Sequence, residues 1–222
     1  MEKWVLAAKR ADFQEIGRKY GIDPVIARII RNRDITEDAE INQYLNGTLD
    51  DIPSWKSLKD IDKAVEIISQ KIDLGTRMRI IGDYDIDGVT ATYILLKGFK
   101  RLGANVDTYI PDRIADGYGI HNHLIKKAKE DGVDTIVTCD NGISAADQIA
   151  FAKKMGMTVV VTDHHEVPFE DTEEGRKYKL PLADAIINPK QSDCTYPNKN
   201  ICGAVVAMKL VFALYEKYGI PE

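Results

Sequence analysis

Hydrophobic positions along the chain follow a helical period first and a strand period later. Up to residue 75 they mix with charge at helical intervals, as at Ile61, Ala64, Val65 and Ile68. From residue 77, short apolar runs predict strands at 78–83, 106–110, 135–139, 158–162 and 185–187. Between and after these runs, helical spacing predicts helices at 90–102, 122–130, 144–155 and 203–218.

Alternation of strands and helices predicts an α/β fold. Such a chain pairs its strands in parallel, so we expect a mostly parallel sheet of about five strands with helices on both faces. We expect two parts, a helical N-terminal segment over residues 1–75 and the sheet domain over residues 76–222. Parallel sheets bind ligands at the carboxyl ends of their strands, so we expect the functional residues at those ends.

Local signals add finer expectations. Ser57 to Asp60 and Ser144 to Asp147 have the spacing of a capping box, which predicts a helix start at each. The stretch 51–55 is expected to be a loop or linker, and the charged run 170–177 a surface loop. The helical lead-in predicts a packing layer, with threading of a substrate as the alternative.

Composition narrows the functional classes. The chain has 222 residues and a formal net charge of −5, which excludes a strongly basic protein that coats nucleic acid by bulk charge. Its three cysteines contain no CxxC pair, so neither a disulfide framework nor a zinc site is expected. No signal peptide and no apolar run of membrane length is visible. We therefore expect a cytoplasmic protein with no membrane partner.

Acidic and imidazole side chains follow three of the predicted strands. The first is followed by Asp83, Asp85 and Asp87, the third by Asp140, and the fourth by the run 163–166, which reads Asp-His-His-Glu. A lone Asp at a strand end is usually a helix cap or a solvated loop residue. Several carboxylates in one crevice would repel one another unless cations lie between them. Carboxylates with an imidazole suit Mn²⁺ or Mg²⁺, so we predict a divalent metal site.

The first acidic motif also carries a geometric expectation. Alternate residues of an extended chain point the same way, so Asp83, Asp85 and Asp87 would converge if the chain stays extended beyond the strand. Gly88 would then permit a tight turn into the next helix. A calcium loop of the EF-hand type is excluded, because the downstream glutamate is missing.

Three motifs carry a family resemblance. GDYDIDGVTAT, CDNGIS and TDHHE resemble the first three motifs of the DHH phosphoesterase superfamily. The linking segments 111–121, 187–197 and 201–210, and the helical lead-in, are similar to the members of that superfamily that are exonucleases specific for single-stranded DNA. The resemblance covers essentially the whole chain.

The resemblance implies two metal ions, Mn²⁺ or Mg²⁺, held by Asp83, Asp85, Asp87, Asp140 and His164. Asp85 and Asp87 would each bind one ion, Asp140 would bridge both, and His164 would hold the second. Asp83 would support the first ion. Two ions so placed would activate a water and neutralise the phosphoryl oxygens.

Further residues have supporting roles. The resemblance implies that His165 faces the substrate phosphate as hydrogen-bond donor or proton shuttle, which makes Asp140 and His165 the catalytic candidates. Asp163 would orient the loop or a ligand histidine rather than touch metal. Side chains near the strand ends could contact substrate, and these weaker candidates are Arg113, Tyr118, Asn141 and Lys190.

The resemblance implies 5'-to-3' hydrolysis of single-stranded DNA in recombination and repair, with single-stranded DNA as the partner, and the sequence does not identify any repair-protein partners. The alternatives are a DHH phosphodiesterase acting on short oligonucleotides or cyclic dinucleotides, a pyrophosphatase, or a catalytically inactive DHH scaffold. The chain departs from the family pattern by ending before the fourth aspartate motif and the DHH-associated domain. We therefore expect a truncated piece whose own activity is weak or absent.

Overall fold

The computed structural model describes residues 3, 9–173 and 175–221. Contacts group the chain into two units, one up to Pro53 and one from Ser54 onward. Residues 54–75 belong with the sheet unit, because helix α4 (Ile61–Asp73) packs on the same core as the strands.

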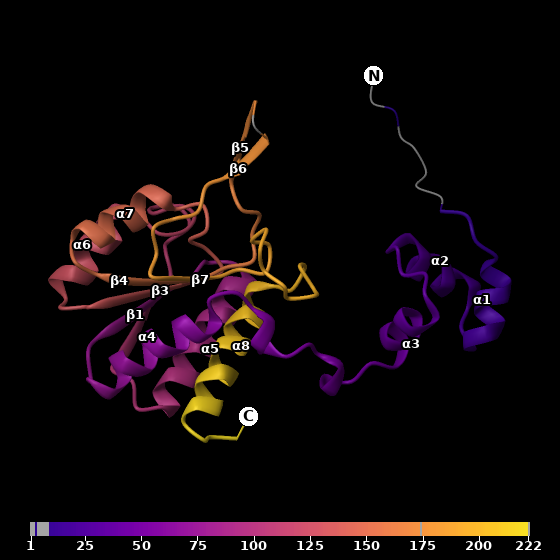
Figure 1. The fold of residues 1–222 in the computed structure, drawn as a ribbon, viewed down its shortest axis with the longest axis horizontal. Coiled ribbons are helices and arrows are strands. Elements are labelled where there is room, and N and C mark those ends of the chain that lie inside the picture. The colour runs from indigo at the N-terminus through magenta and orange to yellow at the C-terminus, as the bar shows by residue number, and fades with distance from the viewer. Residues whose placement is uncertain (1–2, 4–8, 174, 222) are drawn as a thin grey trace. The chain divides into compact units, whose positions relative to one another are not determined.

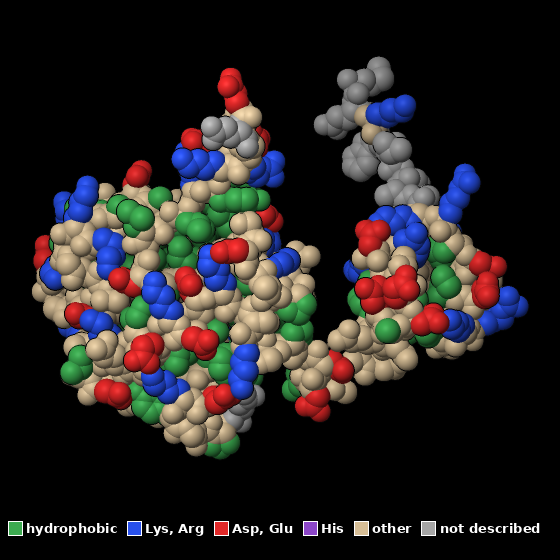
Figure 2. All heavy atoms as spheres, in the orientation of Figure 1, with side chains coloured by type: hydrophobic (Ala, Val, Ile, Leu, Met, Phe, Trp, Pro, Cys, Tyr) green, Lys and Arg blue, Asp and Glu red, His purple; other side chains and the backbone are tan. Residues whose placement is uncertain are grey.

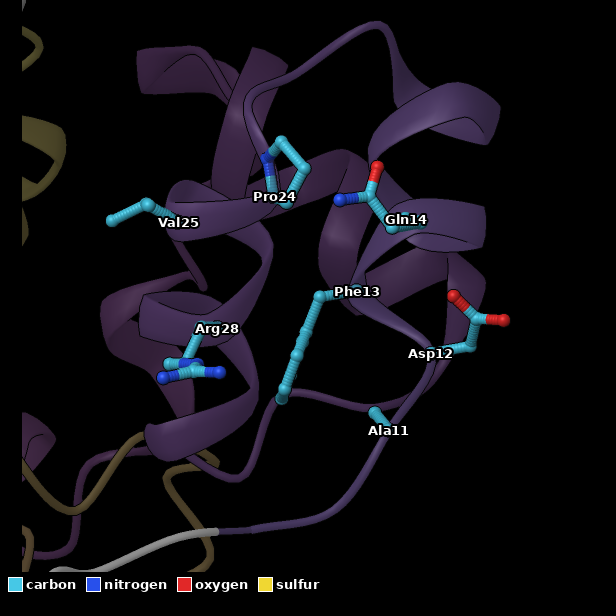
Figure 3. Close-up of a pocket in the computed structure, with 7 residues that line it drawn as sticks. All are labelled: Ala11, Asp12, Phe13, Gln14, Pro24, Val25 and Arg28. Carbon is cyan, nitrogen blue, oxygen red and sulfur yellow. The ribbon is translucent and has the colours of Figure 1, made fainter.

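The N-terminal unit contains three short helices: α1 (Phe13–Tyr20), α2 (Pro24–Asn32) and α3 (Asp38–Asn46). A 3-10 turn, η1 (Leu49–Asp51), follows them. The buried side chains Ala27, Ile30 and Ile41 form its small core. A cavity of about 640 Å³ opens between the starts of α1 and α2, beside Phe13 and Arg28, and contains none of the predicted site residues (Figure 3).

The second unit contains a five-stranded parallel sheet of order β2-β1-β3-β4-β7. Its strands are β1 (Met78–Ile81), β2 (Val106–Tyr109), β3 (Thr135–Cys139), β4 (Thr158–Thr162) and β7 (Ala185–Ile187). β1, β3 and β4 are buried almost throughout, as their apolar sequences require.

Helices cover both faces of this sheet (Figure 1). α4, α5 (Ile86–Arg101) and α8 (Gly203–Lys217) pack on one face, and α6 (Asn122–Glu130) and α7 (Ala146–Lys154) on the other. The predicted fold class, an α/β protein with a helical lead-in, is confirmed. Along the described chain, no helix combines the length and the apolar character needed to cross a membrane.

Helix α5 and helix α8 approach closely at Gly98. A Cβ atom at this position would lie 2.5 Å from Cγ2 of Val211, which is inside any real contact distance. The absence of a side chain at Gly98 therefore sets the spacing of the two helices whose first turns reach the acidic edge of the sheet.

Helices begin close to both predicted capping boxes, but neither box forms. Helix α4 begins after Asp60, which adopts a left-handed conformation and makes no side-chain cap; its Oδ2 instead accepts from the Ile186 amide at 3.1 Å. Helix α7 begins at Ala146, also without a side-chain cap. The Ala145 amide donates to the Gly142 carbonyl, so Ser144 lies in a turn that precedes the helix.

The surface loop expected at 170–177 is instead an antiparallel hairpin of β5 (Phe169–Thr172) and β6 (Gly175–Tyr178). The rings of Phe169 and Tyr178 pair across its base, with centroids 6.2 Å apart. The hairpin projects from the sheet unit, and its charged side chains lie above a hydrophobic patch (Figures 1 and 2). Cross-strand ring packing and ion pairs favour strands here over an irregular loop.

Candidate metal centre

The first acidic motif does not remain extended. Strand β1 ends at Ile81, and helix α5 begins at Ile86 rather than near Thr90. Asp85 is the N-cap of α5, where its Oδ1 accepts from the Gly88 amide at 2.9 Å, and Asp87 lies in the first helical turn. The convergence expected from strand alternation is therefore wrong, because a helix start separates Asp87 from the other two.

Three carboxylates nevertheless meet at the ends of β1 and β3. Asp83, Asp85 and Asp140 each offer an oxygen within 4.8 Å of the others. Asp140 directly follows β3 and adopts a left-handed backbone conformation, with φ of 60°. Asp83 and Asp140 are each only 2% exposed, so their carboxylates lie in a buried recess at the sheet edge.

Asp87 faces a different neighbour, the first turn of α8. Its oxygens accept from the amides of Gly203 and Ala204, at 2.6 and 2.8 Å. Asp87 Oδ2 also lies 3.4 Å from Nε2 of His164, and the same Nε2 lies 2.9 Å from Oδ1 of Asp140. Asp140, His164 and His165 also offer ligand atoms within 4.8 Å of one another, so Asp140 belongs to a second group, which Asp87 borders through its contact with His164.

Gly203 makes this arrangement possible. A Cβ atom there would lie 2.7 Å from Oδ1 of Asp140. The two backbone amides that receive Asp87 were not found by sequence reasoning, because main-chain donors leave no signature in residue type. The only signal was that segment 201–210 belongs to the family resemblance.

Asp163 accepts hydrogen bonds from both histidines. It is fully buried, and its carboxylate accepts from the amides of Ile143, His164 and His165 and from Nδ1 of His165 at 2.8 Å. Burial alone would raise the pKa of Asp163, but the hydrogen bonds from His165 and Ile143 outweigh it and hold that pKa low. Asp163 thus orients the loop and the ring of His165, whereas it meets the predicted ligand His164 only at its backbone amide.

The pKa values of the two histidines are shifted in opposite directions. Burial, followed by the neighbouring His165, lowers the pKa of His164, which favours the neutral imidazole that binds metal. The hydrogen bond to Asp163 raises the pKa of His165, which favours the charged imidazolium. Adjacent residues are therefore suited to different tasks.

Burial and the nearby carboxylates raise the pKa of two of the acidic residues. Burial, and then the charges of Asp87 and Asp85, raise the pKa of Asp140 to about 8. Burial, and then Asp85, also raise the pKa of Asp83. Oδ1 of Asp83 is buried with no hydrogen-bond donor in the described part of the chain, and the buried Oδ1 of Asp140 meets Nε2 of His164 at 2.9 Å without an aligned hydrogen bond. Orphaned carboxylate oxygens beside an imidazole fit a divalent cation of the Mn²⁺ or Mg²⁺ type.

The weaker candidates occupy unequal positions. The Tyr118 hydroxyl donates to the Asp140 carbonyl at 3.1 Å and lies 3.3 Å from Nδ1 of His165, so it borders the site. Lys190 pairs with Glu166 at 2.9 Å beside the histidines. The Arg113 guanidinium lies 5.4 Å from the ring of Tyr84, a residue that sequence reasoning did not single out.

Asn141 differs from these three because it is buried. It is 1% exposed, and its amide donates to the carbonyls of Ile81 and Cys139. A side chain so enclosed cannot reach a substrate, so its position does not support the substrate-binding role considered from the sequence.

An α/β sheet with carboxylates and histidines gathered at its strand ends is the architecture of a metal-dependent phosphoesterase domain. The chain belongs to the DHH family: residues 77–221 match the N-terminal domain of that family.

Relatives of the chain include single-stranded-DNA-specific exonucleases named RecJ. That of Salmonella typhimurium is 39% identical over 87% of this chain and 31% of its own length, and that of Bacillus subtilis is 37% identical over 87% and 23%. The chain thus spans about a third or less of these curated relatives. A RecJ structure bound to manganese matches with a TM-score of 0.64 at 32% identity, covering 74% of this chain and 39% of that one. The Thermus thermophilus RecJ with Mn²⁺ matches with 0.66 at 27%, covering 97% and 29%.

Proposed function

We propose that this chain carries the metal centre of a 5'-to-3' exonuclease that hydrolyses phosphodiesters of single-stranded DNA in recombination and repair, within the cytoplasm. The observation that carries the proposal is the sharing of Asp140 between two groups of ligands. One group adds Asp83 and Asp85, and the other adds His164 and His165, with Asp87 beside His164. This sharing supports two adjoining cation positions, of which Asp87 and His164 would hold the second.

Two Mn²⁺ or Mg²⁺ ions in these positions would lower the pKa of a bound water and neutralise phosphoryl oxygens. The protein's own residues would hold this arrangement rigid. Asp85 is fixed by the Gly88 amide and Asp87 by the first turn of α8, so neither carboxylate must be reorganised when substrate arrives.

His165 is the proposed contact to the substrate phosphate. Because Asp163 binds its Nδ1, the ring is held in one orientation and Nε2 remains available. The raised pKa of His165 favours the imidazolium, which can donate to a phosphate oxygen or transfer a proton. Tyr118, Arg113 and Lys190 are proposed to bind the strand around it.

The choice of substrate is supported by the relatives, whose names specify single-stranded DNA. The choice of ion is supported by RecJ structures described with Mn²⁺ and with Mg²⁺. Because the chain spans only part of those relatives, the complete activity is proposed for the protein that carries this chain.

The test is digestion of single-stranded DNA labelled at the 5' or the 3' end, with Mn²⁺ or with chelator, by the protein that carries this chain. We expect metal-dependent release from the 5' end and loss of essentially all activity in Asp140→Ala. Equal turnover in Asp140→Ala would overturn the shared role of that residue. Preference for cyclic dinucleotides over long single strands would overturn the substrate assignment while leaving the metal chemistry intact.

A further inference from the structure

Asn141 lies between the two strand ends that carry the acidic residues. Its Nδ2 donates to the carbonyl of Ile81, the last residue of β1, at 3.1 Å. The same group donates to the carbonyl of Cys139, the last residue of β3, at 2.9 Å. One buried side-chain amide therefore joins the ends of two neighbouring parallel strands.

The local backbone puts Asn141 in that position. Asp140 adopts φ of 60° and Gly142 φ of 114°, so the chain reverses tightly on leaving β3. A Cβ atom at Gly142 would lie 2.5 Å from Oγ1 of Thr138, and only glycine fits there. The reversal keeps Asn141 against the sheet, where its amide reaches β1.

The charges on either side act to separate these two strand ends. Asp83 and Asp85 follow β1, whereas Asp140 follows β3, and all three oxygens approach within 4.8 Å. When they are ionised, as they are when they bind a cation, carboxylates so close repel one another across the β1–β3 boundary. The Asn141 amide opposes that separation, because moving β1 away from β3 would leave the buried Ile81 carbonyl without this donor.

We propose that Asn141 is a positioning residue that fixes the spacing of Asp83 and Asp85 against Asp140, and so sets the affinity of this carboxylate group for a divalent cation. The inference rests on the proposed metal-dependent function and deepens it. Asn141 touches neither ion nor substrate in this role; it acts through the two backbone carbonyls. Residues of this kind behind metal ligands typically change metal affinity by about 10–100-fold when removed.

The chain offers a matched control at Gln191. That residue is also a buried amide, and its Nε2 donates to the carbonyl of Ile186 in β7 at 2.8 Å and to that of Asn188 at 3.4 Å. Both amides have an unpartnered buried oxygen among the described residues. They differ in place, because Gln191 bonds at the edge strand and Asn141 joins β1 to β3.

The experiment is titration of the full 222-residue chain with Mn²⁺, following free Mn²⁺ by electron paramagnetic resonance. We expect Asn141→Ala to weaken the tighter binding by about 10-fold or more, and Gln191→Ala to change it less than about 2-fold. Circular dichroism before each titration verifies folding. If Asn141→Ala does not fold, Asn141→Ser, which retains one donor, should bind with intermediate affinity.

Wild-type affinity in folded Asn141→Ala or Asn141→Ser would overturn this inference and leave the proposed function standing. An equal loss in Gln191→Ala would also overturn it, because the effect would then be general destabilisation. Absence of Mn²⁺ binding by the wild-type chain would instead overturn the proposed function itself.

Discussion

Asp140 is predicted to destabilise the metal-free protein, so that Asp140→Asn is more stable than the wild type when no cation is present. The residue is 2% exposed and shares its recess with other carboxylates. Ionising it there costs burial and charge repulsion, which is why its pKa rises to about 8. Asparagine has the same shape and cannot ionise, so the variant avoids that cost.

The magnitude follows from the pKa. The ordinary value is 3.8, and a raised pKa in the folded state means that the unfolded chain releases the proton more easily. Below about pH 4, Asp140 is protonated in both the folded and the unfolded state, so it costs no stability. As pH rises from about 4 to about 8, the unfolded chain releases the proton first, and the free energy of unfolding falls by about 1.4 kcal/mol per pH unit. At pH 8 the loss is roughly 5 kcal/mol, as an order of magnitude.

The assay is urea unfolding of the wild type and Asp140→Asn at pH 5 and pH 8, in chelator and in Mn²⁺. In chelator, we expect the difference in unfolding free energy to favour the variant and to grow from pH 5 to pH 8. In Mn²⁺, the wild type should gain about 2.7 kcal/mol at 100 times its dissociation constant, and the variant much less. A variant less stable than the wild type at pH 8 in chelator would refute the reasoning.

Two further predictions concern buried positions near the site. Asp163→Asn should lower the unfolding free energy by about 3 kcal/mol in chelator, because the new side-chain amide faces backbone donors. The difference from the wild type should shrink at low pH, where Asp163 is itself protonated. Equal stability of the variant and the wild type at pH 8 would contradict this prediction. Gly98→Ala should cost about 1–3 kcal/mol by overpacking against Val211. Val211→Ala in the Gly98→Ala background should recover part of that loss, and additive losses in urea unfolding would contradict this.

The sheet could be predicted because its strands are recognisable in the sequence. Buried parallel strands are continuous apolar runs, and β3 and β4 occur at the predicted residues. Parallel pairing then brings the ends of β1, β3 and β4 to one edge, whatever the loops do. Proximity of the acidic residues follows from topology alone, so the sequence could predict a crowded carboxylate edge without knowledge of side-chain geometry.

Local choices at the strand ends could not be predicted in the same way. Asp85 can continue an extended chain or cap a helix, and the hydrogen bond from the Gly88 amide stabilises the cap. Asp60 has the sequence context of a capping box, yet its carboxylate binds the distant Ile186 amide. Short polar side chains have several nearby partners of similar energy, and tertiary contacts select among them.

The position of Asp87 depends on α8, a helix that begins more than a hundred residues later in the chain. Without the amides of Gly203 and Ala204, Asp87 would face Asp140 and His164 with no fixed orientation. With them, its negative charge lies at the positive end of a helix. Gly203 also leaves room for Asp140, so one helix start both orients Asp87 and admits Asp140. The orientation of Asp87 beside His164 is therefore a consequence of how α8 packs on α5, which no local pattern encodes.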